Sequence, residues 1–165
     1  MLLNPWIYAA RPKTLIASIA PIICSIIIIP DIANINIWIL FFVFLSALCI
    51  QIGTNFINDL QDHLKGTDNE NRLGPKRMVS SGMIAVDQMQ RGIKLIFFIA
   101  FLAGAPLVYY GGWPILLIGM SGLCLAYLYT AGPMPIAYTP SGEVFVLLYF
   151  GVLAVSGSYY LQTGA

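Results

Sequence analysis

Long apolar stretches alternate with short polar ones along most of this 165-residue chain. Each apolar stretch is continuous, which favours a helix over a strand of a membrane barrel, where apolar and polar residues would alternate over about ten positions. A helix needs about 20 apolar residues to cross the roughly 30 Å hydrocarbon core of a bilayer. The pattern therefore predicts five membrane-crossing helices, at residues 14–29, 37–57, 93–110, 113–130 and 144–161.

One polar segment directly follows the second apolar stretch. Residues 55–68, NFINDLQDHLKGTD, contain three aspartates, two asparagines, a lysine and a histidine. Charged side chains in a membrane helix cost about 2.5–3.5 kcal/mol each on insertion scales, so a cluster at this boundary indicates a site. If residues 51–62 form one helix, Asn55, Asp59 and Asp62 stand at i, i+4 and i+7 on one face, with Asn58 beside them.

The composition fixes the broad class. Hydrophobic residues make up 59% of the chain and charged residues only 9%, whereas soluble domains carry about 25% charged residues. We therefore predict an integral membrane protein with an all-α fold, a multispan transmembrane helical bundle embedded in the lipid bilayer. A net charge of +1 argues against binding to nucleic acid.

The cations predict an orientation. All eight lie before the first apolar stretch or around the segment between the second and third: Arg11, Lys13, Lys65, Arg72, Lys76, Arg77, Arg91 and Lys94. With five crossings these two regions share one side, and the positive-inside rule places them in the cytoplasm. We expect a multi-pass protein of the cytoplasmic (inner) membrane whose N-terminus and aspartate-rich loop, at about residues 58–83, are cytoplasmic.

The loop chemistry suits a metal-bound diphosphate. Asp59, Asp62 and Asp68 offer the hard oxygen ligands that Mg²⁺ accepts, and Mg²⁺ typically binds through one or two carboxylates plus substrate phosphates. The cations that could neutralise the phosphates are Lys65, Arg72, Lys76 and Arg77. The alternative is a solvated loop face that serves only as an orientation signal. It leaves the helical register of Asn55 with the aspartates unexplained, since loop charges need no register.

These residues resemble a known family. Residues 58–62, NDLQD, are similar to NDxxD, the first aspartate-rich motif of the UbiA-type intramembrane aromatic prenyltransferases. The continuations KGTD at 65–68 and RLGPKR at 72–77 look most like the branch that acts on 1,4-dihydroxy-2-naphthoate. The broader pattern NDxxDxxxD would place an acid at Gly66, so the third-ligand role falls on Asp68. RPKTL at 11–15, YTAGP at 129–133 and YYLQTG at 159–164 extend the resemblance over nearly the whole chain.

The resemblance implies an Mg²⁺-dependent enzyme of menaquinone biosynthesis. Such an enzyme transfers a polyprenyl group from polyprenyl diphosphate to dihydroxynaphthoate, with loss of the acceptor's carboxylate, and gives demethylmenaquinone. Ionising an allylic diphosphate produces an anion and a carbocation, which need metal and cations at one end of the site and a dry, aromatic-lined cavity at the other. We expect Asp59, Asp62, Asp68 and Arg72 to be catalytic. The expected substrate-binding residues are Asn55, Asn58, Lys65, Lys76 and Arg77. Arg11 could face the diphosphate, but a role in orientation is the stronger expectation.

The resemblance also concerns length. It implies about nine membrane helices in two similar halves, each with an aspartate-rich motif, and each crossing takes about 20 residues. This chain holds about five, and no DxxxD or DxxD follows Ala85. We therefore expect residues 1–165 to be the N-terminal part of a single transmembrane prenyltransferase domain.

Other functions stay open at this stage. A different aromatic acceptor, such as 4-hydroxybenzoate, fits the same motifs. A multispan transporter subunit also places polar groups at helix breaks, but transport sites usually need them near the midplane, whereas the ionisable residues here collect at one membrane face. A noncatalytic membrane fragment that binds a partner half would share the fold.

Overall fold

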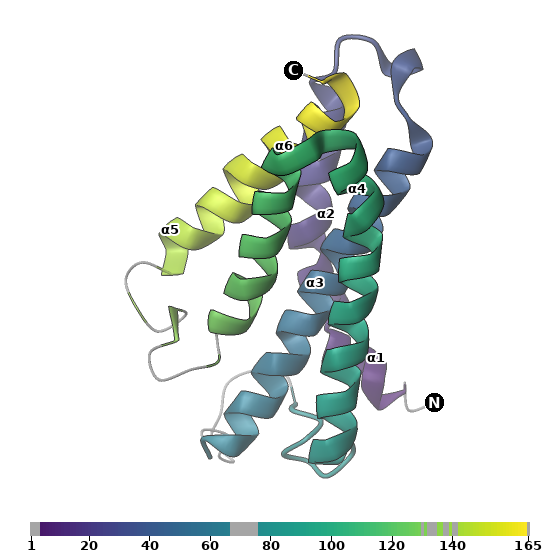
Figure 1. Cartoon of the computed structure of the whole chain (residues 1–165). Helices are drawn as coiled ribbons and strands as arrows, with labels where there is room; N and C mark the ends of the chain where they lie inside the picture. Colours follow the sequence, from purple (N-terminus) through teal and green to yellow (C-terminus); the bar gives the residue numbers. More distant parts are fainter. Residues whose placement is uncertain are drawn as a thin grey trace.

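The computed structural model describes residues 4–66, 76–129, 131, 135–136, 139 and 142–164. The four leading helices are α1 (Pro5–Ala10), α2 (Pro12–Ile27), α3 (Ile37–Leu64) and α4 (Val86–Leu128). A final helical segment joins α5 (Gly142–Val146), the π-helix η3 (Leu147–Leu153) and α6 (Ala154–Thr163). No strand occurs in these described residues, and the predicted all-α fold is confirmed (Figure 1).

The helix α3 carries the aspartate-rich motif. Asn36 is its N-cap, and the Asn36 side chain accepts hydrogen bonds from the backbone N–H groups of Trp38 and Ile39. The helix continues to Leu64 and ends where Gly66 takes a left-handed conformation with φ 63°. Residues 51–62 therefore form one helix, as the shared face of Asn55, Asp59 and Asp62 requires. The polar segment leaves the helix after Leu64 rather than at about residue 58.

The helix α4 is two antiparallel helices. Gly112 has φ 65° and ψ −152°, a conformation that breaks the helix and turns the chain back. Figure 1 shows the first half of α4 running beside α3 and the second half returning. This turn falls between the predicted crossings at 93–110 and 113–130, as the sequence pattern indicated.

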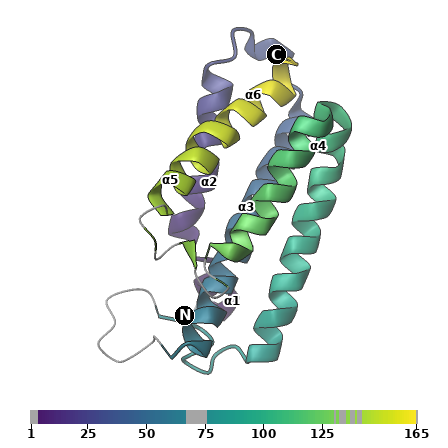
Figure 2. The same cartoon turned by 60° about the vertical axis from the view of Figure 1, so that its left-hand side comes forward.

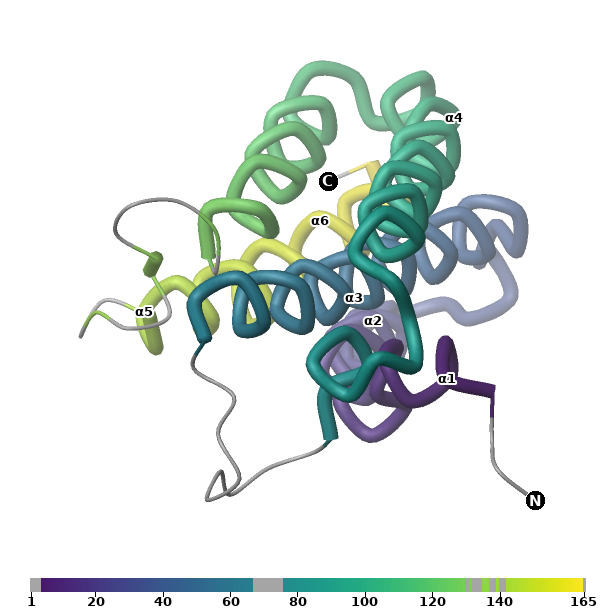
Figure 3. The backbone as a smooth tube through the Cα atoms, turned by 90° about the horizontal axis from the view of Figure 1, so that it is seen from below, coloured from purple at the N-terminus to yellow at the C-terminus, as the bar shows by residue number. Residues whose placement is uncertain are grey.

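Length and composition support a membrane bundle. Three segments are long and apolar enough to cross a membrane, namely α3, α4 and Gly142–Thr163, and the turn at Gly112 divides α4 into two antiparallel apolar helices. The 16 residues of α2 form a shorter apolar helix, about 24 Å long. Figure 2 shows α6 beside α2, and Figure 3 shows both halves of α4 on one side of α3 with α2 on the other.

Packing and hydrogen bonds hold the two ends of the bundle. Near the motif, Phe56 and Leu60 of α3 pack against Met78 and Met89. At the other end, a second cluster contains Ile22, Ile39, Val43, Leu107 and Ile115. There the backbone N–H of Asn36 donates to Oε1 of Gln162 at 2.8 Å, and Nε2 of Gln162 donates to the Asn36 carbonyl at 3.2 Å. These contacts tie the start of α3 to the end of α6 and leave the middle of the bundle for a cavity.

Candidate active site

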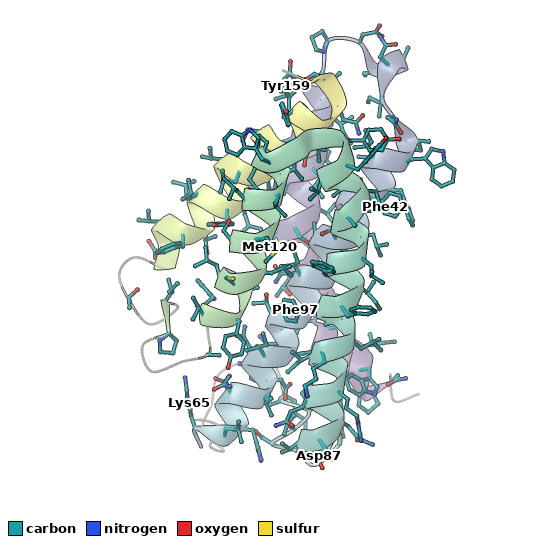
Figure 4. All side chains as sticks on the ribbon, viewed as in Figure 1. Phe42, Lys65, Asp87, Phe97, Met120 and Tyr159 are labelled. Atoms are coloured by element: carbon teal, nitrogen blue, oxygen red, sulfur yellow. The ribbon has the colours of Figure 1, made fainter. Side chains whose placement is uncertain are left out.

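A largely apolar cavity of about 560 Å³ lies inside the bundle. Its walls come from α2, α3, both halves of α4 and the α5–α6 segment. Four polar residues line it where α2 begins and α3 approaches its end, namely Arg11, Gln51, Asn55 and Asn58. In Figure 4 this end of the bundle is marked by Lys65 and Asp87, and Tyr159 marks the opposite end. One end of the cavity is therefore polar, and the rest of its wall is largely apolar.

Asn55 fixes the junction between α1 and α2. It is 3% exposed, and its Nδ2 donates to the Ala10 carbonyl and to Oγ1 of Thr14, both at 2.8 Å. An amide buried at this depth costs free energy unless it is hydrogen-bonded, and these two bonds satisfy both of its hydrogens. Asn55 thus holds the start of α2 against α3.

Arg11 stands at this junction in a strained conformation. Its φ of 51° and ψ of 72° are left-handed, and it is the one non-glycine residue with positive φ in the described part of the chain. Such a conformation costs about 1–2 kcal/mol for a residue with a Cβ and is often found at functional sites. The bend lets α1 end and α2 begin within one residue and places the Arg11 side chain on the cavity wall.

The carboxylate of Asp59 is hydrogen-bonded to the backbone of the segment before α4. It is 1% exposed, and its two carboxylate oxygens accept hydrogen bonds from the N–H groups of Met78 and Val79, each at 2.9 Å. The carboxylate therefore ties the segment before α4 to the helix α3. An ionised carboxylate has further lone pairs, so these bonds do not exclude another ligand.

Asp62 forms a buried ion pair with Arg77. The Nη2 of Arg77 contacts Oδ2 of Asp62, and each side chain is 7% exposed. A buried charge requires such compensation, because an unpaired carboxylate would pay a large desolvation cost. The bonds of Asp59 at residues 78 and 79 place Arg77 next to Asp62, so the two aspartates act on the same segment.

Asn58 has an uncompensated oxygen on the cavity wall. Its Oδ1 is buried and finds no hydrogen-bond partner among the described residues. Asn58 and Asp62 are four residues apart on α3, one helical turn, so their oxygens lie on one side of the helix. An orphaned buried acceptor beside a carboxylate is a feature that a cation or a donor group would satisfy.

The other predicted site residues lie elsewhere. Lys65 and Lys76 are exposed, outside the cavity wall. Asp68 and Arg72 lie outside the described residues. Of the predicted set, Asn55 and Asn58 line the cavity. Asp59, Asp62 and Arg77 are buried beside the segment before α4 and are not among the residues that line the cavity.

Residues 18–165 match the UbiA prenyltransferase family. The chain belongs to this family. It is 34% identical to a 1,4-dihydroxy-2-naphthoate octaprenyltransferase of Haemophilus influenzae, over 98% of this chain and 55% of that protein. Proteins of the same name from Bacillus subtilis and Escherichia coli are 34% and 31% identical, over 93% and 95% of this chain and 49% and 53% of theirs. The chain spans about half the length of these curated relatives.

UbiA prenyltransferases generally use a divalent metal ion. The residues here fit such an ion by donor chemistry, because Asn58 offers a buried, unsatisfied oxygen and Asp62 a carboxylate one turn away. No group of three His, Cys, Asp or Glu side chains converges within the described residues, so substrate oxygens would have to complete the coordination. Such a site suits a hard divalent cation that takes one or two carboxylates from the protein and fills its remaining positions with phosphate and water.

Sequence reasoning missed part of the polar end of the cavity. Gln51, Thr54 and Thr14 also line it. The signal for Gln51 was present, since 51, 55, 58 and 62 follow the spacing i, i+4, i+7 and i+11 of one helix face. Thr14 carried no such signal, because its position depends on how α2 packs against Asn55.

Proposed function

We propose that this chain forms the diphosphate-binding end and part of the prenyl cavity of an aromatic prenyltransferase that acts on 1,4-dihydroxy-2-naphthoate. The proposal depends on the cavity of about 560 Å³, which is polar at one end and largely apolar along the rest of its wall. A polyprenyl diphosphate has the same division, a hydrocarbon tail and an anionic head. The names of the relatives support the acceptor and the place of the reaction in menaquinone biosynthesis.

The proposed roles follow from position. Asp62 and Asn58, with Asp59 and Asp68, would hold Mg²⁺, which when bound supplies positive charge to the departing diphosphate. Arg11, on the cavity wall, and Arg77, beside Asp62, would bind the diphosphate oxygens together with Arg72, Lys65 and Lys76. Asp59 additionally holds the segment that carries Arg77. Asn55 would act by keeping Arg11 and Thr14 in place.

The aromatic part of the cavity wall would stabilise the allylic carbocation. Phe145, Tyr149 and Phe150 contribute aromatic rings to its wall. Aromatic faces attract cations most strongly where water is excluded. These rings would therefore stabilise positive charge on the allylic carbon and keep water from intercepting it.

We also propose that residues 1–165 correspond to the N-terminal part of the relatives' membrane domain, in a cytoplasmic membrane with the motif on the cytoplasmic side. The order of the motifs and the distribution of Lys and Arg support this. The mass of the native product, compared with the coding sequence beyond codon 165, tests the first half of this statement.

A binding experiment tests the site. Purified chain in nanodiscs is titrated with farnesyl diphosphate in the presence and absence of Mg²⁺. We expect Mg²⁺-dependent binding that Asp62→Asn weakens at least tenfold, because the substitution removes a ligand charge and leaves the shape. Asp87→Ala removes an exposed acid at the start of α4 and should leave the affinity unchanged. Wild-type affinity in Asp62→Asn would refute the metal-diphosphate site.

A turnover experiment tests the acceptor. The chain is assayed alone and together with the part of a relative that it does not cover, with dihydroxynaphthoate and 4-hydroxybenzoate in parallel. We expect prenylation of dihydroxynaphthoate. Preference for 4-hydroxybenzoate would contradict the proposed branch of the family.

A further inference from the structure

Two glycines of α4, Gly104 and Gly119, are among the residues that line the cavity. Gly119, in the second half of the helix, is flanked along the wall by Ile115, Gly122 and Ala126, the positions i−4, i+3 and i+7. Gly104, in the first half, precedes Leu107 and Val108 on the same kind of face. Both glycines therefore border the space where the prenyl tail of the proposed substrate would lie.

Neither glycine is required by packing. A Cβ placed on Gly104 or Gly119 would meet no atom within 4 Å. By contrast, a Cβ on Gly111 would lie 2.2 Å from Cγ1 of Ile115, and one on Gly53 would lie 2.7 Å from Cε2 of Phe97. Those two glycines permit close contact between side chain and backbone. Gly104 and Gly119 instead leave open space, although glycine within a helix costs about 0.5–1 kcal/mol relative to alanine.

The two glycines lie at a similar depth. Each is seven or eight residues from the turn at Gly112, on opposite sides of it, which corresponds to about 10–12 Å along each helix. Tyr129, which lines the cavity where α4 ends, is ten residues beyond Gly119, or about 15 Å. Figure 1 shows that this end of α4 and the end of α3 point the same way, so a tail whose diphosphate is held near Asn58 must pass both glycines to reach the turn.

We propose that Gly104 and Gly119 determine the length of prenyl chain that the cavity accepts. This inference rests on the proposed function. A short tail ends before it reaches the two glycines, so side chains added there do not change its binding affinity. A long tail occupies the space that their missing side chains leave, so bulk at either position excludes it.

Length-dependent binding tests the proposal. The full chain in nanodiscs is titrated with geranyl diphosphate and octaprenyl diphosphate in Mg²⁺. Gly119→Phe and Gly104→Phe should weaken octaprenyl diphosphate binding at least tenfold and change geranyl diphosphate binding less than twofold. The matched controls are Met120→Phe and Ala105→Phe, which add similar bulk to exposed neighbours outside the cavity wall and should change neither affinity.

The outcomes separate the two proposals. Failure of the unmodified chain to bind either diphosphate overturns the proposed function and this inference with it. Normal binding by the unmodified chain, with equal losses for both ligands in Gly119→Phe or no loss in either glycine variant, overturns the inference alone. Gly119→Leu, checked for helix content and monodispersity, repeats the test with a smaller side chain and should show the same length dependence if Gly119→Phe does not fold.

Discussion

Asp59 uses both of its carboxylate oxygens to hold the backbone at residues 78 and 79. Removing it leaves two buried N–H donors without acceptors, and each such loss costs about 1–3 kcal/mol. We predict that Asp59→Ala lowers the free energy of unfolding by about 2–6 kcal/mol. Asp59→Asn, which keeps one acceptor oxygen, should lose about half as much.

Denaturant unfolding in detergent and limited proteolysis of the segment before α4 would measure this effect. Asp87→Ala, at an exposed acid, serves as the control. If Asp59→Ala and Asp87→Ala unfold alike and the segment resists protease in both, the carboxylate does not hold it.

The buried pair of Asp62 and Arg77 makes a second prediction. Truncating one partner leaves the other charge buried and unpaired, which costs roughly 3–5 kcal/mol. We expect Asp62→Ala and Arg77→Ala each to destabilise by this amount, and the double variant to lose clearly less than their sum. Lys76→Ala, at the exposed neighbour, should change stability by at most about 0.5 kcal/mol. A double-mutant cycle with a coupling energy near zero would rule out the pair.

For individual residues, the sequence predicted which side chains share a face of α3, but it did not predict the groups that these side chains contact. Helical spacing placed Asn55, Asp59 and Asp62 on one side of α3, and all three are buried. The partners of Asp59 are backbone amides about 20 residues away, and backbone amides carry no residue-type signal. The left-handed conformation of Arg11 was equally hidden, because no glycine marked it.

Among the elements, the π-helix η3 best explains the shape of the cavity wall. The residues of this segment that line the cavity include Phe145, Tyr149, Leu153, Gly157 and Leu161, always four apart. In a regular α-helix each four-residue step rotates the side chain by about 40°, or about 160° over the whole series. The wider turn of a π-helix at Leu147–Leu153 offsets this rotation and keeps the series on one side. Hydrophobic periodicity in a uniformly apolar segment could not reveal such a local change.

The turn at Gly112 gives a prediction at the same scale. With φ 65° and ψ −152°, Gly112 occupies a region essentially restricted to glycine, and another residue there costs about 1–3 kcal/mol. We predict that Gly112→Ala lowers the free energy of unfolding by about 1–3 kcal/mol, because the added side chain strains the turn between the two halves of α4. Gly119→Ala is the control for stability, since it lies in regular helix with open space around it and should be neutral or slightly stabilising. Thermal unfolding of the two variants would measure the difference. Equal stability of the two variants would mean that the turn tolerates a side chain.

For the whole molecule, continuous apolar runs were sufficient to predict the fold class and the order of the apolar helices, including the reversal between residues 110 and 113. They could not give the cavity, because its position depends on which faces of α2, α3, α4 and the α5–α6 segment meet. Nor could they show where α3 stops, since its last two turns are polar and continue the helix beyond the apolar run.

The orientation in the membrane makes the last prediction. Residues 32–34 and residues 78–84 lie beyond opposite ends of α3, so a single crossing by α3 puts them on opposite sides of the bilayer (Figure 1). The cations predict that the segment at 78–84 faces the cytoplasm. Single cysteines are introduced by Asn34→Cys and Met83→Cys, at exposed positions, after Cys24, Cys49 and Cys124 are replaced by alanine. An impermeant maleimide should then label Met83→Cys in inverted vesicles and Asn34→Cys in spheroplasts. Labelling of both from one face would show that α3 does not cross the membrane, and exchange of the two results would reverse the orientation and place the aspartate motif outside the cell, away from a cytosolic supply of prenyl diphosphate.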